Sequence, residues 1–314
     1  MFDLIIIGIG PGGLAASIYA SRYRIKHLLI GKDLGGAMAL SSWVENYPGF
    51  PRISGLELTQ KMAEHAQGLG IEVMSGEVAV LEKTSGGDFL VKTEAGQEYQ
   101  AKTLIIATGT KRRELGVPGE KEYLGRGVSY CTTCDAAFFK NKAVAVVGGA
   151  NAAVMGAVHL AEYASRVYLI YRKKPLRAEP IWAERAENNQ KIKVLYETRV
   201  TEILGDGQKV SGIKIEPAYS GQNKLSLEGI FIEAGGVPGT ELVKPLGVAI
   251  DERGYIKVGV NMSTNVPGVF AAGDIANAAG ELQQVVTAAS EGAIAATSVF
   301  KYLQSVRSGS CRTD

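Results

Sequence analysis

The 314-residue chain has few cysteines, few histidines and no strong excess of charge of either sign. Three cysteines are too few for the disulfide framework of a small secreted domain. A net charge of +2 gives no dense basic face for a nucleic acid backbone. The apolar run from Leu4 ends at Gly8, so we expect neither a signal peptide nor a membrane span. These absences favour a cytoplasmic protein with a small-molecule or protein substrate, and without nucleic acid or membrane as a partner.

Glycine, by contrast, is abundant, and many of the 39 glycines stand between an apolar strand and a helix. Residues 4–7 are followed by Gly8-Ile9-Gly10-Pro11-Gly12-Gly13 and then by a helical pattern of small residues from 14 to 20. Gly8 permits a tight turn, Gly10 lets the backbone approach a pyrophosphate, and Gly13 lets the helix pack on the strand. This first corner predicts a dinucleotide site. An acidic residue that hydrogen-bonds the ribose is usual at the end of the next strand, but this chain has Gly31-Lys32 there.

The same pattern occurs a second time. A strand at 143–147 precedes the corner Gly148-Gly149-Ala150-Asn151-Ala152-Ala153, a helix at 154–163 and a strand at 166–171. Basic residues follow that strand, at the distance where the 2′-phosphate of NADPH is met: Arg172, Lys173, Lys174 and Arg177. A solvated basic loop is the alternative. Ala150 counts against the nucleotide, because its methyl stands where the backbone approaches the pyrophosphate.

Between the two corners lies Cys131-Thr132-Thr133-Cys134-Asp135. Cysteines at this spacing can form a redox disulfide, and the acid after the second cysteine suits thiol exchange. Half of a zinc site or an inert buried pair are the alternatives. Zinc would need two further ligands from Cys311, His27, His65 and His159, which are scattered in the sequence. We expect Cys311, in the polar tail, to be a free thiol.

Two dinucleotide corners with a disulfide between them predict a hydride donor, a flavin and a disulfide acceptor. The last third of the chain supports the flavin. Residues 266–274 read as a strand ending in Gly273-Asp274, whose acid can accept a hydrogen bond from a ribityl hydroxyl. An alanine-rich helix from about 283 to 303 would then direct its N-terminal end toward the flavin ring. Elsewhere, the pattern predicts a helix over 54–69 capped by Ser54, and small antiparallel strands over 71–102.

Together these motifs resemble the low-molecular-weight thioredoxin reductases over essentially the whole chain. The resemblance is carried by residues 8–13, 44–51 (Val-Glu-Asn-Tyr-Pro-Gly-Phe-Pro), 107–109, 127–135 and 269–274. It implies an α/β protein with two Rossmann-like dinucleotide-binding domains, the second inserted into the first, each with a small antiparallel β element. The FAD-binding domain would comprise 1–114 and 244–314, and the NAD(P)H-binding domain with the disulfide would comprise 115–243. The family pattern further implies a homodimer, rotation of the inserted domain, and thioredoxin or a thioredoxin-like protein as partner.

Carried onto this chain, the resemblance makes Cys134 the sulfur nearest the flavin, Cys131 the attacking sulfur and Asp135 the general acid and base. The FAD-binding residues would be Gly8, Gly10, Pro11, Gly13, Gly35, Gly36, Asn46, Ala107, Thr108, Gly109, Gly273, Asp274, Gln283 and Gln284. The NADPH-binding residues would be Gly148, Ala150, Asn151, Ala153, Arg172, Lys173 and Arg177. No metal is expected.

The chain departs from the family at several of these places. Ala37-Met38 replace Gln-Leu, Gln283 replaces an arginine, and Met155-Gly156 replace two glutamates; Tyr171-Arg172-Lys173 replace His-Arg-Arg. Three hypotheses follow. The first is an NADPH-dependent reductase of thioredoxin or a similar protein. The second keeps FAD and the disulfide but takes electrons from ferredoxin or another flavin. The third is a flavoprotein that has lost catalysis and serves as a binding module.

Overall fold

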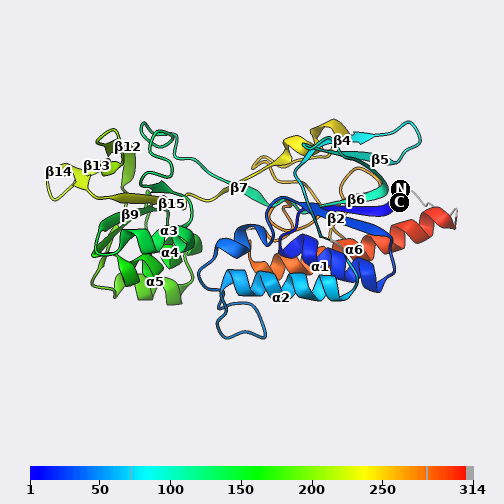
Figure 1. Ribbon diagram of the computed structural model, residues 1–314, viewed down its shortest axis with the longest axis horizontal. Helices are drawn as coiled ribbons and strands as arrows, with labels where there is room; N and C mark the ends of the chain where they lie inside the picture. The colour runs from blue at the N-terminus through cyan, green and yellow to red at the C-terminus, as the bar shows by residue number, and fades with distance from the viewer. Residues whose placement is uncertain (72, 281, 309–314) are drawn as a thin grey trace. The chain divides into compact units, whose positions relative to one another are not determined.

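The computed structural model describes residues 1–71, 73–280 and 282–308 (Figure 1). These residues form two compact units. Unit 1 comprises 1–39, 44–111 and the described residues from 238 onward, and unit 2 comprises 40–43 and 112–237. Cys311 lies outside the described residues. No helix in the described part of the chain is long and apolar enough to cross a membrane.

Unit 1 is built on one seven-stranded sheet with the order β3-β2-β1-β6-β5-β4, and β17 also pairs with β6. The strands are β1 (Phe2–Ile7), β2 (His27–Gly31), β3 (Val73–Ser75), β4 (Val78–Lys83), β5 (Phe89–Thr93), β6 (Glu98–Ile106) and β17 (Val269–Ala271). The strands around β1 run parallel, whereas β4, β5 and β6 pair antiparallel. Residues 4–7 of β1 and 104–106 of β6 are buried and apolar, as expected for a parallel sheet covered by helices.

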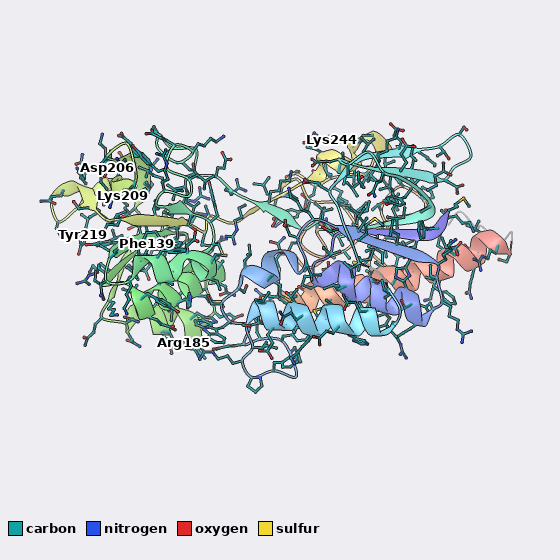
Figure 2. The ribbon with its side chains drawn as sticks, viewed as in Figure 1. Phe139, Arg185, Asp206, Lys209, Tyr219 and Lys244 are labelled. Atoms are coloured by element: carbon teal, nitrogen blue, oxygen red, sulfur yellow. A yellow bond between two sulfur atoms is a disulfide. The ribbon has the colours of Figure 1, made fainter. Side chains whose placement is uncertain are left out.

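Three helices of unit 1 lie along one side of this sheet in Figure 1: α1 (Pro11–Arg22), α2 (Gly55–Gly68) and α6 (Val285–Arg307). α6 packs closely on α1 because glycines stand at their crossing. A Cβ placed at Gly292 would lie 2.0 Å from the Gly12 carbonyl oxygen. Two 3-10 helices, η1 (Gly36–Leu40) and η3 (Thr240–Leu246), complete the unit's regular structure. In η3, Lys244 pairs with Glu241 at 2.7 Å (Figure 2).

Unit 2 contains a five-stranded parallel sheet with the order β11-β10-β9-β15-β8. Its strands are β8 (Val128–Ser129), β9 (Ala143–Val147), β10 (Arg166–Ile170), β11 (Ile192–Leu195) and β15 (Gly229–Ile232). An antiparallel sheet adds β12 (Arg199–Gly205), β13 (Val210–Tyr219) and β14 (Gln222–Ser226). The helices are α3 (Thr132–Asp135), η2 (Ala136–Phe139), α4 (Asn151–Tyr163) and α5 (Pro180–Glu187).

The core of unit 2 has two parts: one lies between the parallel sheet and these helices, and the other lies between the parallel sheet and the antiparallel sheet. The ring of Phe139 meets that of Phe231 edge to face at 5.2 Å, and Arg185 stacks 4.2 Å above the buried ring of Trp182 (Figure 2). At the turn between β12 and β13, Asp206 accepts hydrogen bonds from the backbone N–H groups of Gln208 and Lys209. The chain passes between the units through β7 (Thr110–Arg112) and β16 (Gly236–Pro238), which pair with each other.

Each unit has the strand, glycine corner and helix that the sequence predicts, so the α/β class with two Rossmann-like units is confirmed. The N-cap role of Ser54 is also confirmed, since its hydroxyl accepts from Glu57 N at 3.1 Å. Other boundaries differ. Within 266–274 the strand covers only Val269–Ala271, because Val269 N bonds to Val266 O and closes a turn at Gly268. α6 begins two residues later than expected, because Gln284 is its N-cap, and runs on to Arg307.

Candidate active site

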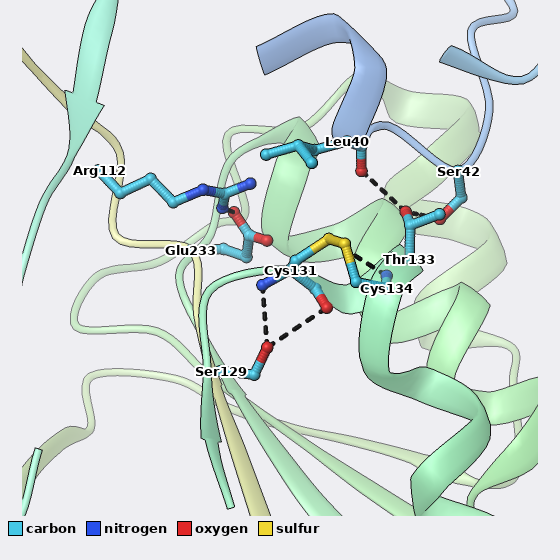
Figure 3. Close-up of a disulfide and its surroundings, with 8 residues drawn as sticks. All are labelled: Leu40, Ser42, Arg112, Ser129, Cys131, Thr133, Cys134 and Glu233. Atoms are coloured by element: carbon cyan, nitrogen blue, oxygen red, sulfur yellow. Dashed lines mark hydrogen bonds and ion pairs between the residues drawn. A yellow bond between two sulfur atoms is a disulfide. The ribbon is translucent and has the colours of Figure 1, made fainter. Parts of the chain in front are cut away.

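Cys131 and Cys134 form a disulfide at the start of α3, with their Cα atoms 5.3 Å apart (Figure 3). The Cys134 N–H donates to the Cys131 sulfur at 3.1 Å. Ser129, at the end of β8, accepts from the Cys131 N–H at 3.0 Å and donates to its carbonyl oxygen at 3.3 Å. Bonded to each other, the two sulfurs form the redox-competent pair that the spacing predicts, rather than half of a zinc site.

The helix that carries the disulfide is held from two sides. The Thr133 hydroxyl donates to the Leu40 carbonyl oxygen at 2.8 Å and lies 2.7 Å from the Ser42 hydroxyl (Figure 3). On the other side Thr132 is buried against α4, where a Cβ at Gly156 would lie 2.8 Å from its methyl group. Helix α3, with the disulfide at its start, therefore packs against α4, whose first turn belongs to the second glycine corner.

Cys131 and Asp135 open onto a pocket of about 300 Å³ within unit 2. Its walls include the apolar side chains of Leu124 and Val128, and Arg112 also lines it. The Arg112 guanidinium donates to Glu233 at 2.7 Å, and the Glu233 side chain is only 9% exposed. Burial raises the pKa of Glu233, and the neighbouring Arg112 acts in the opposite direction. The pocket wall therefore includes one partner of the Arg112–Glu233 ion pair, and Cys131 and Asp135 line the same pocket.

A buried carboxylate that the sequence analysis did not identify supports the segment before Cys131. Glu120 is 2% exposed and accepts from Leu115 N at 2.8 Å, Gly116 N at 2.7 Å and the Tyr130 hydroxyl at 2.6 Å. Burial and the Glu120 carboxylate both raise the pKa of Tyr130. Tyr130 therefore remains a neutral donor that ties the residue next to Cys131 to the loop after β7.

The first glycine corner has the geometry that a dinucleotide requires. Gly8 has φ +116°, and a Cβ there would lie 2.1 Å from the Ala107 carbonyl oxygen. A Cβ at Gly13 would lie 1.8 Å from the Gly8 carbonyl oxygen, so the helix can pack on β1 only without a side chain. At Gly10 the nearest atom to such a Cβ is 3.8 Å away. Gly10 is the N-cap of α1 and Pro11 follows, without a capping side chain, so the helix N-terminus fits a pyrophosphate.

Most of the predicted FAD residues meet around this corner. Gly35 donates its N–H to the Ile9 carbonyl oxygen at 2.8 Å, and Gly36 lies next to Gly10. On the side of α6, the Asn46 amide donates to Gln284 at 3.1 Å, and the Gln283 amide donates to the Asp274 carbonyl oxygen at 3.4 Å. Ala107, Thr108 and Gly109 directly follow β6, and the first two lie beside Gly8.

Two acids lie together at the carboxyl end of β17. Burial raises the pKa of Asp274, which follows Gly273 in the turn. The second acid, Glu291 of α6, is 6% exposed and accepts from Gly273 N at 2.7 Å. Sequence reasoning missed Glu291 because it stands in an alanine-rich helix. The helical periodicity could have identified it, because Glu291 lies on the same face of the helix as Ala288 and Ala295, which are both buried.

The second corner has the same strand, glycine turn and helix as the first, with one difference at Tyr171. Gly148 has φ +152°, Ala150 is the N-cap of α4, and Asn151 accepts from Glu179 N at 2.8 Å. The side chains of Arg172, Lys173 and Arg177 are exposed, and Arg177 N donates to the Gly149 carbonyl oxygen at 2.7 Å. The difference is Tyr171, whose ring lies against Gly149, only 2.3 Å from where a Cβ would stand. Ala153 is fully buried behind the corner.

Two dinucleotide corners and a redox disulfide define a nucleotide-dependent oxidoreductase of disulfides. The family model for pyridine nucleotide-disulphide oxidoreductases matches residues 2–292. The chain is 41% identical to a thioredoxin reductase of Listeria innocua over 309 residues, which is 98% of this chain and 95% of that protein.

Solved structures agree with this. The crystal structure of Lactococcus lactis thioredoxin reductase (FR conformation) matches with a TM-score of 0.91 and 39% identity, covering 97% of this chain and 99% of that one. A ferredoxin-flavin thioredoxin reductase of Clostridium acetobutylicum matches with a TM-score of 0.53 and 32% identity, over 97% and 98%. The chain belongs to the pyridine nucleotide-disulphide oxidoreductases and, within them, to the low-molecular-weight thioredoxin reductases. The family uses FAD and NADPH.

Proposed function

We propose that this protein passes electrons from NADPH through FAD and the Cys131–Cys134 disulfide to thioredoxin or a similar small dithiol protein. The observation that carries the proposal is the disulfide itself. Its helix, α3, packs against α4 in the unit that contains the second dinucleotide corner. FAD supplies the step between the two-electron chemistry of a nicotinamide and that of a disulfide. The remaining steps belong to side chains of this chain.

After reduction of the pair, Cys131 acts as the nucleophile. Asp135 takes the proton of the Cys131 thiol, and the resulting thiolate attacks one sulfur of the partner's disulfide; the partner's other sulfur leaves as a thiolate and takes that proton from Asp135. Asp135 then takes the proton of the Cys134 thiol, and the Cys134 thiolate attacks the Cys131 sulfur of the mixed disulfide. The partner's remaining sulfur leaves and takes this second proton, so the partner is released as a dithiol and the Cys131–Cys134 bond is restored. The Cys134 N–H, at 3.1 Å from the Cys131 sulfur, supports this assignment because a hydrogen bond favours the charged thiolate. Cys134 is the sulfur nearest the flavin in this proposal.

The binding roles follow the two corners. In unit 1, the α1 N-terminus would hold the FAD pyrophosphate and Asp274 would accept from a ribityl hydroxyl. In unit 2, the α4 N-terminus would hold the NADPH pyrophosphate, and Arg172, Lys173 and Arg177 would hold its 2′-phosphate. These roles correspond to an FAD domain of 1–114 and 244–314 and an NADPH domain of 115–243.

Three further features belong to this proposal. The protein would be a homodimer, its inserted domain would rotate during turnover, and it would act in the cytoplasm, where thiols are kept reduced. Size-exclusion chromatography with light scattering measures the first of these directly.

Anaerobic stopped-flow reduction of the purified flavoprotein tests the donor and the disulfide together. We expect rapid flavin bleaching with NADPH, slow bleaching with NADH, and reduction of thioredoxin only when both cysteines are present. Replacing Arg172 and Arg177 by alanine should weaken NADPH binding, while Lys224→Ala, an exposed basic residue on β14, should leave it unchanged. Cys134→Ser should abolish thioredoxin reduction. Reduction of thioredoxin that survives Cys134→Ser would refute the assignment of the disulfide.

A different electron donor is the second candidate, and the second corner favours it. The Tyr171 ring against Gly149 and the methyl of Ala150 both narrow the place where a pyrophosphate would lie. With such a donor, neither NADPH nor NADH would bleach the flavin, whereas dithionite would. Reduced ferredoxin would then restore disulfide reduction.

A further inference from the structure

Glu291 is a buried carboxyl that the proposed reaction does not use. It lies on α6, 6% exposed, and its Oε2 atom accepts from Gly273 N at 2.7 Å. Gly273 has φ +75° and immediately precedes Asp274, the acid proposed to receive the ribityl chain. The hydrogen bond therefore fixes the peptide that sets the direction of Asp274.

The same turn of α6 adjoins the proposed pyrophosphate site. Gly292 packs on Gly12, in the first turn of α1, with a hypothetical Cβ 2.0 Å from the Gly12 carbonyl oxygen. A Cβ at Gly12 would in turn lie 3.3 Å from the Ala288 carbonyl oxygen and 3.6 Å from that of Ala272. Glu291 thus lies where α6, the end of β17 and the start of α1 meet. Both neighbouring sites are expected to carry negative charge, one on Asp274 and one on the pyrophosphate.

Nothing among the described residues around Glu291 offers it a positive charge. The elements packed against α6 are α1, β6 and β17. α1 contributes Gly12 and Ala16 at this contact, β6 ends in the apolar residues 104–106, and the turn after β17 contributes Asp274. Burial raises the pKa of Glu291 and the charge of Asp274 raises it further, against the backbone N–H groups of Gly273 and Ala279; the result is about 7.

We propose that Glu291 positions the Gly273–Asp274 turn for the flavin and holds a proton when FAD is bound. This rests on the proposed FAD site. A protonated Glu291 keeps an oxygen that accepts from the Gly273 N–H, yet adds no negative charge beside Asp274 and the pyrophosphate. At any pH at which Glu291 is ionised in the flavin-free protein, FAD binding is then coupled to the uptake of one proton by Glu291.

The coupling has a definite sign. Below about pH 7 Glu291 is already neutral in the flavin-free protein, so the affinity for FAD does not depend on its titration. Above that pH a proton must be taken up, and the affinity falls toward about tenfold per pH unit. Glutamine at this position is neutral at every pH and retains an oxygen acceptor.

Equilibrium dialysis of the holoenzyme against FAD, between about pH 5.5 and about pH 8.5, tests the proposal without any electron donor or partner protein. We expect the affinity of the wild type to fall above neutrality, and Glu291→Gln to bind tightly across the range. Glu291→Ala should bind FAD more weakly than Glu291→Gln at every pH, because the Gly273 N–H loses its acceptor. Glu64→Gln, an exposed glutamate of α2, is the matched control and should behave as the wild type.

A second measurement counts the proton. FAD binding in weakly buffered solution near pH 7 should take up as much as about half a proton per flavin in the wild type and less in Glu291→Gln. An affinity that falls with pH equally in wild type and Glu291→Gln would overturn the proposal, as would equal binding by the Gln and Ala variants. Either result would leave the assignment of FAD and the disulfide standing. Failure of the wild type to bind FAD at any pH would instead refute the proposed function.

Discussion

At the scale of single residues, the Tyr130–Glu120 contact allows a sharp test of what holds the disulfide segment. Tyr130→Phe removes one donor of the Glu120 carboxylate, which is 2% exposed and also accepts from Leu115 N and Gly116 N. A lost hydrogen bond to a buried charge costs about 1–3 kcal/mol, so we expect a loss of that size in the free energy of unfolding. Urea denaturation in a Trp43→Phe background, followed by the fluorescence of the buried Trp182 in the same unit, measures it.

Tyr196→Phe is the matched control for that substitution. Its hydroxyl also donates to a carboxylate at 2.6 Å, but the partner, Glu187, is exposed and solvated. We therefore expect a loss below about 1 kcal/mol. Equal losses in the two variants would mean that burial of Glu120 adds nothing to the strength of its contact with Tyr130.

Residues of this kind mark the limit of what the sequence reveals about the site. The spacing of Cys131 and Cys134 and the glycines at 8, 10 and 13 are local patterns with a direct chemical reading, and they predicted both the disulfide and the first corner. Glu291 has its partner on the backbone of another element, at Gly273, and Glu120 accepts from Leu115 N and Gly116 N in an irregular loop and from the Tyr130 hydroxyl. Local sequence patterns do not encode such contacts, and only the packing of α6 against the end of β17 brings Glu291 to Gly273.

At the scale of elements, the contact between α3 and α4 depends on the absence of a side chain at Gly156. Alanine in the interior of a helix is ordinarily about 1 kcal/mol more favourable than glycine. At Gly156, however, the new Cβ would lie 2.8 Å from the Thr132 methyl group and 3.1 Å from its hydroxyl. We expect Gly156→Ala to lose stability in thermal unfolding. The double variant Gly156→Ala/Thr132→Ala should recover it, because the colliding atoms are then absent.

Gly68→Ala, at the end of α2, is the control for helix propensity alone. A Cβ there has no atom within 4 Å, so we expect a gain of up to about 1 kcal/mol. A similar gain in stability for Gly156→Ala would show that α3 is free to move away from α4. The Gly156–Thr132 contact would then not determine the position of the disulfide.

Element boundaries were predictable to different degrees. Helix α2 follows from its N-cap and periodicity, and both carry over to the structure. The strand expected over 266–274 shortens because the turn at Gly268 intervenes, and β3 pairs parallel with β2 rather than joining the antiparallel strands. Strand pairing of this kind depends on the order of the sheet, which periodicity does not specify.

At the scale of the whole molecule, each unit has its own sheet, its own core and one glycine corner, so each cofactor should stabilise a different unit. A ligand that binds only the folded form at about 100 times its dissociation constant adds about 2.7 kcal/mol. Both tryptophans, Trp43 and Trp182, belong to unit 2. The variant Trp43→Phe therefore leaves Trp182 as a single reporter of that unit, while release of flavin reports unit 1.

We expect saturating NADP⁺ to raise the urea midpoint seen by Trp182 in this variant and to leave the midpoint of flavin release nearly unchanged. Added FAD should do the reverse, since its corner is built from β1, α1 and α6 of unit 1. Combining Trp43→Phe with Arg172→Ala and Arg177→Ala should remove the NADP⁺ effect, because the 2′-phosphate then loses its exposed cations. If NADP⁺ leaves the Trp182 midpoint unchanged while FAD still raises that of flavin release, the second corner does not bind this nucleotide. The Tyr171 ring on Gly149 would then be the first contact to examine, with Tyr171→His as the variant expected to restore binding.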